Sequence, residues 1–190
     1  MGLKTIVKVG NITNLSDARY CAGMGVNLAG FPIDQNHPNF ITKEIFTEIS
    51  KWISGVDIVG EVIDDIPEDF DVDLVQFSNP ALVHVAELRG LNYIFSMDLK
   101  EYSALSSLPS GLNPAYYLLE NVDHIQIELL EGIIDHLNAG VLVGHNISPE
   151  NADMYLKTGA SGVALLGSTE DKPGFKDYDS LADILEYLEE

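Results

Sequence analysis

The chain has 190 residues, of which 46% are hydrophobic, so its length and composition suit one compact domain with a full core. Thirty acidic side chains against ten basic ones leave a formal net charge of -20, and the acidic residues are spread along the chain. This charge repels nucleic acid and anionic membranes, so we expect neither as a partner. The single cysteine, Cys21, excludes an intramolecular disulfide and a metal site built from several cysteines.

Charged residues interrupt every apolar stretch before it reaches the roughly 18 to 20 residues that a membrane-spanning helix needs. The N-terminal apolar residues are also flanked by lysines and run directly into a polar segment, which is unlike a secretory signal. We therefore expect a cytoplasmic protein that does not associate with a membrane.

Eight short runs rich in Val, Ile, Leu and Phe recur along the chain, with helix-like stretches between them. This pattern is typical of parallel strands that are buried on both faces and linked by crossover helices. The expected strands are residues 5–9, 26–31, 57–63, 74–77, 92–97, 115–119, 140–143 and 162–166.

Residues that favour helix starts precede most of the intervening stretches. We expect a second helix from Thr42, with an apolar face that carries Ile45, Ile49, Trp52 and Ile53. A later helix around 129–137 and a last one from residue 179 to the end follow from their apolar spacing. The other expected starts are Ser16-Asp17, Asn79-Pro80 and Ser148-Pro149-Glu150.

Eight strand–helix units in this length predict an α/β fold, a compact (β/α)8 TIM barrel that forms a single domain over residues 1–190. Such barrels typically need about 250 residues and seldom fewer than about 200, so some helices must be short or missing. The clearest case is residues 102–113, between strands five and six, where serines, prolines and a glycine favour little more than a turn.

Short motifs along the whole chain match a known family in the right order. Strand one ends in Lys8-Val9-Gly10-Asn11-Ile12-Thr13 and is followed by Asp17-Ala18, which resembles the K-I-C-G-I-T and D-A of phosphoribosylanthranilate isomerase, a tryptophan-biosynthesis barrel. Further similar segments are Leu28-Ala29-Gly30-Phe31, Val75-Gln76, Leu118-Leu119-Glu120, Ser148-Pro149-Glu150-Asn151 and the stretch from Glu170 through Pro173-Gly174 and Lys176-Asp177 to Asp179. The resemblance implies an Amadori-type isomerisation of a phosphorylated aminosugar.

Several positions depart from the pattern of that family, and most of them are positions at which the family has a catalytic or substrate-binding residue. Gly10 stands where the family has its general-base cysteine, and Cys21 falls within the first helix, away from the catalytic face. Asn39, Ser78 and Ala164 align with an arginine, a histidine and an aspartate of the family. The glycine-rich segment that helps to hold the substrate after strand six has no counterpart here. The resemblance therefore implies a scaffold that is retained and chemistry that is largely lost.

Polar residues at strand ends are the remaining candidates for a site, because barrel enzymes use the carboxyl ends of their strands. Glu120 is the candidate general acid, since burial there can keep a carboxyl protonated. For a general base we find no convincing candidate, although His145 and Asp98 lie at the right end of the barrel. The residues expected to contact a substrate are Lys8, Asn11, Gln76 and Asp98. Lys8 is equally well explained as a core lysine paired with Glu61 or Glu120.

Phosphate binding in this class of barrel falls to the loops after strands seven and eight. The candidate phosphate-binding residues are Gly144, His145, Asn146, Gly167 and Ser168. His145 and Asn146 stand where the family has a pair of glycines, and their side chains narrow the space for a phosphate. We expect no cofactor and no metal site, since Asp64, Asp65 and Asp98 are more readily explained as solvated carboxylates in so acidic a chain.

Three hypotheses follow. The chain is a diverged relative of the isomerase that keeps affinity for a small phosphorylated metabolite or anion, or the isomerase activity persists with a different base. Alternatively, the chain is a non-catalytic binding or scaffold protein that uses the barrel exterior. The sequence does not distinguish oligomeric states.

Overall fold

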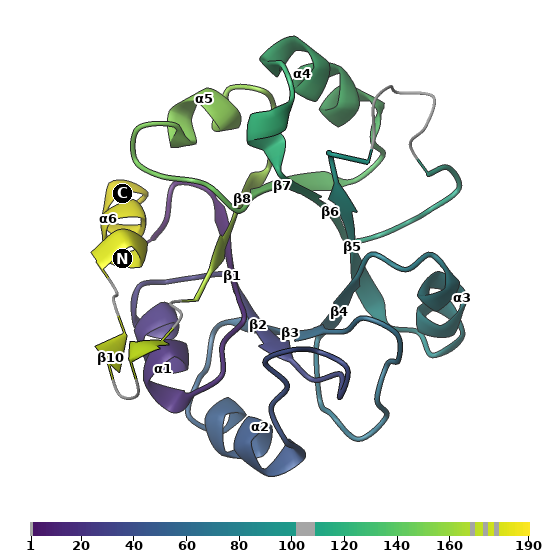
Figure 1. Ribbon diagram of the computed structural model, residues 1–190, viewed down its shortest axis with the longest axis vertical. Helices are drawn as coiled ribbons and strands as arrows, with labels where there is room; N and C mark the ends of the chain where they lie inside the picture. Colours follow the sequence, from purple (N-terminus) through teal and green to yellow (C-terminus); the bar gives the residue numbers. More distant parts are fainter. Residues whose placement is uncertain (1, 102–108, 168–169, 173–174, 177–178) are drawn as a thin grey trace.

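The computed structural model describes residues 2–101, 109–167, 170–172, 175–176 and 179–190. Eight parallel strands close into a barrel in chain order, with the helices outside it (Figure 1). The strands are β1 (Ile6–Gly10), β2 (Leu28–Pro32), β3 (Asp57–Glu61), β4 (Leu74–Phe77), β5 (Asn92–Asp98), β6 (Tyr116–Glu120), β7 (Gly140–Gly144) and β8 (Gly162–Leu166). The predicted (β/α)8 barrel is confirmed, and each strand begins and ends within two residues of its expected position.

The helices are short, as the length of the chain requires. They are α1 (Leu15–Gly23), α2 (Lys43–Ser50), α3 (Ala81–Leu88), α4 (Ile127–His136), α5 (Ala152–Leu156) and α6 (Asp179–Tyr187). A single 3₁₀ turn, η2 (Val122–His124), follows β6, and a two-stranded ribbon of β9 (Glu170–Lys172) and β10 (Phe175–Lys176), which the sequence analysis missed, follows β8. In the part of the chain that the structure describes, no helix is both long and apolar enough to cross a membrane.

Local signals place some helix starts correctly and others not. Thr42 is the N-cap of α2, as expected, and its hydroxyl faces the Ile45 N–H. Residues 148–150 were expected to open α5, but they form a turn, and the helix begins only at Ala152. The expectation that Trp52 belongs to the buried face of α2 is also wrong, because this side chain follows the end of the helix and is 62% exposed.

Residues 62–73, all of which the structure describes, connect β3 to β4 without a helix. The buried Asp34 carboxylate organises this connection, since its Oδ2 accepts the backbone N–H groups of Ile63, Asp64 and Asp65 at 2.8 to 3.1 Å. The predicted short or missing helix between β5 and β6 lies largely at 102–108, outside the described residues.

Side chains alternate between the two faces of each strand, so every second residue points into the barrel. Seven inward side chains form an apolar floor, namely Leu28, Val59, Leu74, Ile94, Leu118, Leu142 and Ala164. The outward side chains pack with the helices in a second, larger apolar cluster that includes Val7, Phe31, Phe46 and Phe95. Two residues beyond the floor, at the carboxyl end of the barrel, the inward positions of β3 to β6 become polar.

Candidate functional site at the barrel mouth

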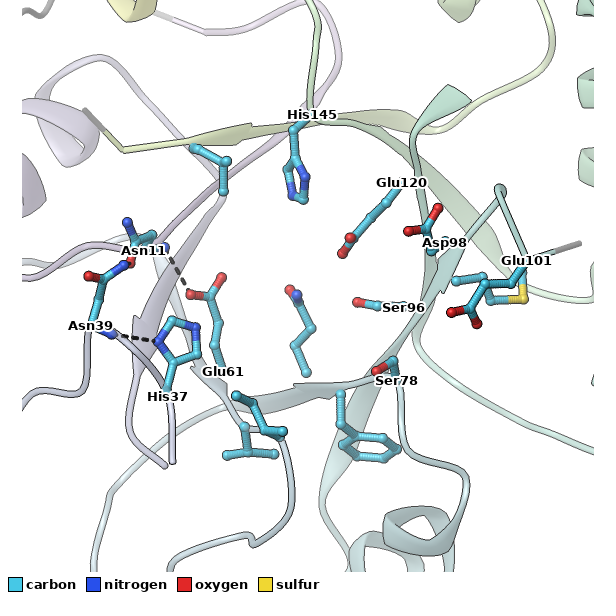
Figure 2. Close-up of a pocket in the computed structure, with 16 residues that line it drawn as sticks. Asn11, His37, Asn39, Glu61, Ser78, Ser96, Asp98, Glu101, Glu120 and His145 are labelled. Carbon is cyan, nitrogen blue, oxygen red and sulfur yellow. Dashed lines mark hydrogen bonds between the residues drawn. The ribbon is translucent and has the colours of Figure 1, made fainter. Parts of the chain in front are cut away.

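The polar layer above the floor follows directly from the period of two along the strands. Glu61 lies two residues after Val59, Gln76 two after Leu74, and Ser96 two after Ile94. The same step carries β6 from Leu118 to Glu120. Together with the loops above them, these side chains line a cavity of about 590 Å³ at the barrel mouth, shown in Figure 2. A volume of this size is typical of a site for a small molecule.

A buried ion pair occupies the side of the mouth formed by β1, β2 and β3. The Lys8 ammonium lies 2.5 Å from Glu61 Oε1, and Lys8 and Glu61 are only 1% and 7% exposed. Glu61 Oε2 accepts the backbone N–H of Asn11 at 2.8 Å (Figure 2). Of the two partners that the sequence analysis left open for Lys8, the structure selects Glu61.

Two glycines make room for this pair. A Cβ atom on Gly10 or on Gly30 would overlap Glu61 Oε1, and it would lie 2.9 or 2.8 Å from Lys8 Nζ respectively. Gly10 is the position that aligns with the general-base cysteine of the family. The Glu61 carboxylate therefore fills the space into which a side chain at position 10 would extend.

Glu61 remains ionised despite its burial. Burial alone would raise the pKa of this carboxyl, but the Lys8 charge and the hydrogen bonds from Lys8 and Asn11 lower it below the usual value for a glutamate. Both carboxylate oxygens already have donors, so Glu61 is a weak proton acceptor. The pair is best explained as a fixed part of the wall.

Two loop residues continue this wall above the pair. Asn11 has a φ of 58°, in the left-handed region that asparagine tolerates better than most residues, which turns its N–H toward Glu61. Its side-chain oxygen accepts Asn39 Nδ2 at 3.0 Å, and the Asn39 N–H donates to His37 Nδ1 at 3.2 Å. Asn39 and Ser78, which replace an arginine and a histidine of the family, both lie on the cavity wall.

The opposite side of the mouth carries two more carboxyls from neighbouring strands, Asp98 and Glu120, which are paired in register. Burial raises the pKa of Glu120, and the charges of Asp98 and Glu61 raise it further, while Lys8 acts in the other direction. Burial also acts to raise the pKa of Asp98, but hydrogen bonds from the Lys100 N–H and the Asn121 side chain lower it below the usual value. The pKa of Glu120 is therefore shifted in the direction that a general acid requires, and the pKa of the neighbouring Asp98 is shifted in the opposite direction.

His145 enters the cavity from the end of β7 (Figure 2). Burial lowers the pKa of this imidazole to about 4, and the positive charge of Lys8 contributes in the same direction. At neutral pH His145 is therefore uncharged and can both donate and accept a hydrogen bond.

Two buried polar atoms in the cavity wall have no hydrogen-bond partner within the described part of the chain, Gln76 Oε1 and Ser96 Oγ. Ser96 is only 7% exposed, and its hydroxyl points into the cavity (Figure 2). Leaving such groups unpaired costs about 1 to 3 kcal/mol each. A molecule in the cavity, either water or a ligand, can supply the missing partners.

The candidate phosphate loops use several of their N–H groups internally. Gly167 donates to Gly10 O at 2.8 Å, and Ile147 donates to His145 O at 2.7 Å. The Ser148 N–H donates to Asn151 Oδ1, also at 2.8 Å. Gly144 packs so closely on β8 that a Cβ there would lie 2.6 Å from Ala164 O, while Asn146 is exposed. Ser168 lies outside the described residues, and phosphate binding by these loops stays a prediction.

The structure brings Lys8, Asn11, Gln76, Asp98, Glu120 and His145 to one mouth, and it adds Ser96, His37 and Glu101, which the sequence analysis missed. Ser96 had a signal, since it is the one polar residue inside an otherwise apolar strand core. His37 and Glu101 lie on loops, where no periodic pattern reveals their direction. Among the described residues, no group of three or more His, Cys, Asp or Glu side chains is arranged to hold a metal ion.

No protein-family model and no curated protein matches the sequence. The fold, however, is closely similar to solved structures. A phosphoribosylanthranilate isomerase in complex with reduced 1-(o-carboxyphenylamino)-1-deoxyribulose 5-phosphate has a TM-score of 0.76 at 21% identity, covering 97% of this chain and 98% of that one. The isomerase from Thermus thermophilus has a TM-score of 0.78 at 20% identity, covering 96% and 98%.

The same fold also serves a different enzyme. A thiamine phosphate pyrophosphorylase from Pyrococcus furiosus has a TM-score of 0.67 at 19% identity, covering 97% of this chain and 94% of that one. Identities this low establish the fold and leave the activity to be argued from the site. The resemblance that the motifs predicted is thus confirmed as a likeness of structure: the chain has the barrel fold of the phosphoribosylanthranilate isomerases along almost its whole length.

Proposed function

We propose that this chain is an isomerase-like barrel that binds a small polar metabolite at its mouth and has lost Amadori isomerisation of phosphoribosylanthranilate. The observation that carries the proposal is the Lys8–Glu61 pair, whose carboxylate fills the space beside Gly10 where the cysteine base of the family would extend. Amadori rearrangement needs a base that removes a proton from carbon as well as an acid. Glu61 has both of its oxygens hydrogen-bonded, which makes it a poor base.

Cys21 does not replace the missing thiol. It is fully buried within α1, on the outside of the barrel, and burial, reinforced by the Asp17 charge, raises the pKa of its thiol to about 12. A thiol in this environment stays protonated at neutral pH and is not a nucleophile or base.

The cavity supports a binding role over a purely structural one. A scaffold that uses only the barrel exterior gains nothing from unpaired polar groups, and each of them costs folding free energy. Yet Gln76 Oε1 and Ser96 Oγ in the cavity wall have no hydrogen-bond partner in the described part of the chain, and the pKa of Glu120 beside them is raised. Perturbed carboxyls and unpaired polar atoms that converge on one cavity are typical of functional sites.

A complementation experiment tests the loss of isomerase activity. A strain that lacks the isomerase and requires tryptophan is supplied with this gene, with its Gly10→Cys variant, or with a functional isomerase as the positive control. We expect growth without tryptophan only from the positive control. Growth supported by the wild-type chain, at matched expression, would mean that the activity persists with a different base.

A further inference from the structure

We propose that the mouth of this barrel is a site for a small hydroxylated organic cation, such as an amino-polyol, rather than for a phosphorylated anion. The inference rests on the proposed small-molecule function and names its ligand class. It follows from three features of the described residues: the charges that line the cavity, its unpaired hydrogen-bonding atoms, and the state of the loop N–H groups.

The charged side chains at the cavity are mostly negative. Four carboxyls line it, Glu61, Asp98, Glu101 and Glu120, and among the described residues none that lines it is Lys or Arg. The Lys8 ammonium forms an ion pair with Glu61, so these two groups carry no net charge together. No Lys or Arg among the described lining residues faces Asp98 or Glu101, although the charges of Lys100 and His124 reach Asp98 and help to lower its pKa. Glu120, whose pKa is raised, adds negative charge only in its ionised form. This surplus repels an anion and attracts a cation.

The unpaired atoms point to the same ligand class by an independent route. Gln76 Oε1 can only accept a hydrogen bond, and the Ser96 hydroxyl accepts as well as donates. A ligand that satisfies both, with the Asp98 and Glu120 carboxyls nearby, must be rich in N–H and O–H donors. An ammonium group supplies three donors and a positive charge, and hydroxyl groups supply the rest.

A phosphate finds less to bind. Phosphate sites in barrels use free backbone N–H groups of the loops after β7 and β8. Here the N–H groups of Ile147, Ser148 and Gly167 already donate within the protein. His145 adds no positive charge, because burial holds its imidazole neutral at pH 7. Among the described residues of these two loops, three backbone N–H groups are therefore already used within the protein, and His145 supplies no countercharge.

The inference is tested with three probes that share one carbon skeleton: 1-amino-1-deoxy-D-sorbitol, D-sorbitol and D-sorbitol 6-phosphate. Each is titrated into the ¹⁵N-labelled protein at pH 7 and about 150 mM salt, and binding is followed at the backbone amides of Ser96 and Asp98. Screening at this salt concentration weakens the general attraction of cations to a strongly acidic protein. We expect the amine to bind at least tenfold more tightly than sorbitol, and the phosphate to bind more weakly than either.

Two variants with the same change in net charge separate the site from the overall charge. Asp98→Asn removes a carboxylate of the cavity, whereas Asp135→Asn removes an exposed one on α4, outside the barrel. We expect Asp98→Asn to weaken binding of the amine about tenfold, the loss of one charge-assisted contact, and to leave sorbitol unchanged. Asp135→Asn should leave both unchanged. Glu101→Gln, which removes another carboxylate of the cavity, serves as a second test if Asp98→Asn proves unstable.

The outcomes are distinct. Tightest binding of the phosphate would overturn the inference and favour an anion site at the loops after β7 and β8. Equal binding of amine and sorbitol, or an equal loss in both variants, would also overturn it but would leave the proposed small-molecule function standing. If none of the three probes binds at 20 mM, on the order of the weakest affinities of interest, the proposed function itself fails.

Discussion

Replacing Gly10 with alanine is the sharpest perturbation of the barrel mouth. The new Cβ would overlap Glu61 Oε1 and lie 2.9 Å from Lys8 Nζ. The backbone of β1 is held in place here, because Gly10 pairs with Leu166 of β8 and the Gly10 carbonyl accepts the Gly167 N–H. The carboxylate must therefore move away from Lys8, from the Asn11 N–H, or from both.

The expected cost follows from these contacts. Overpacking a well-filled interior costs about 1 to 3 kcal/mol. Loss of one charge-assisted hydrogen bond adds about 1.5 to 3 kcal/mol, because the freed charge stays buried. We therefore expect Gly10→Ala to lower the free energy of unfolding by roughly 2.5 to 6 kcal/mol. Gly30→Ala, whose Cβ would meet the same two atoms, should cost a similar amount.

Urea unfolding followed by circular dichroism measures these effects. Gly23→Ala is the matched control, since nothing lies within 4 Å of its Cβ position at the end of α1, and it should cost nothing. Gly10→Ala is then introduced into a Lys8→Met, Glu61→Ala background, in which its added cost should fall below about 1 kcal/mol, since the obstructing groups are gone. An equal cost in both backgrounds would refute the idea that these glycines exist to make room for the ion pair.

Three further predictions concern titrating groups. Glu120→Gln should raise the urea midpoint at pH 7, because the raised pKa of Glu120 means that its ionised form opposes folding. This increase in the midpoint should vanish below about pH 4, where the carboxyl is protonated in the folded and the unfolded protein. Because the pKa of His145 is about 4 in the folded protein, its buried neutral form should lower the free energy of unfolding by roughly 3 kcal/mol as the pH falls from 6.5 to 4, at about 1.4 kcal/mol per pH unit. The difference in unfolding free energy between wild type and His145→Gln across that pH range measures this effect. Asp34→Ala should lower the free energy of unfolding by about 2 to 4 kcal/mol at pH 7, since Asp34 Oδ2 accepts three backbone N–H groups and Oδ1 accepts a fourth, from Asn36. These four donors outweigh burial and lower the pKa of Asp34, so this contribution should persist down to about pH 4 and be lost only below it.

The barrel was predictable because the signals that define it are local. Short apolar runs at regular spacing mark buried parallel strands, and the bounds of β4 and β8 match their expected residues completely. The connection after β3 was not predictable in this way. Its conformation depends on Asp34, a residue about 30 positions earlier in the chain, and no short-range pattern reveals such a bond.

The candidate site was predictable only in part. The glycine at position 10, where the isomerase motif has a cysteine, is visible in the sequence, and the place of Glu120 at a strand end predicts that it lies at the barrel mouth. Which carboxyl pairs with Lys8 depends on the register and on side-chain direction across the barrel, so two partners remained open until the structure selected Glu61. The role of Gly30 was hidden for the same reason, since its neighbours come from two other strands.

The central claim is that this barrel keeps the fold of the isomerases without their reaction. The most direct test incubates the purified wild-type chain with phosphoribosylanthranilate and measures the isomerised product by chromatography, with a functional isomerase as the positive control. The account predicts product no higher than in buffer alone, for the wild type and for Gly10→Cys. Steady turnover by the wild-type chain that disappears in a Glu120→Gln variant would contradict it.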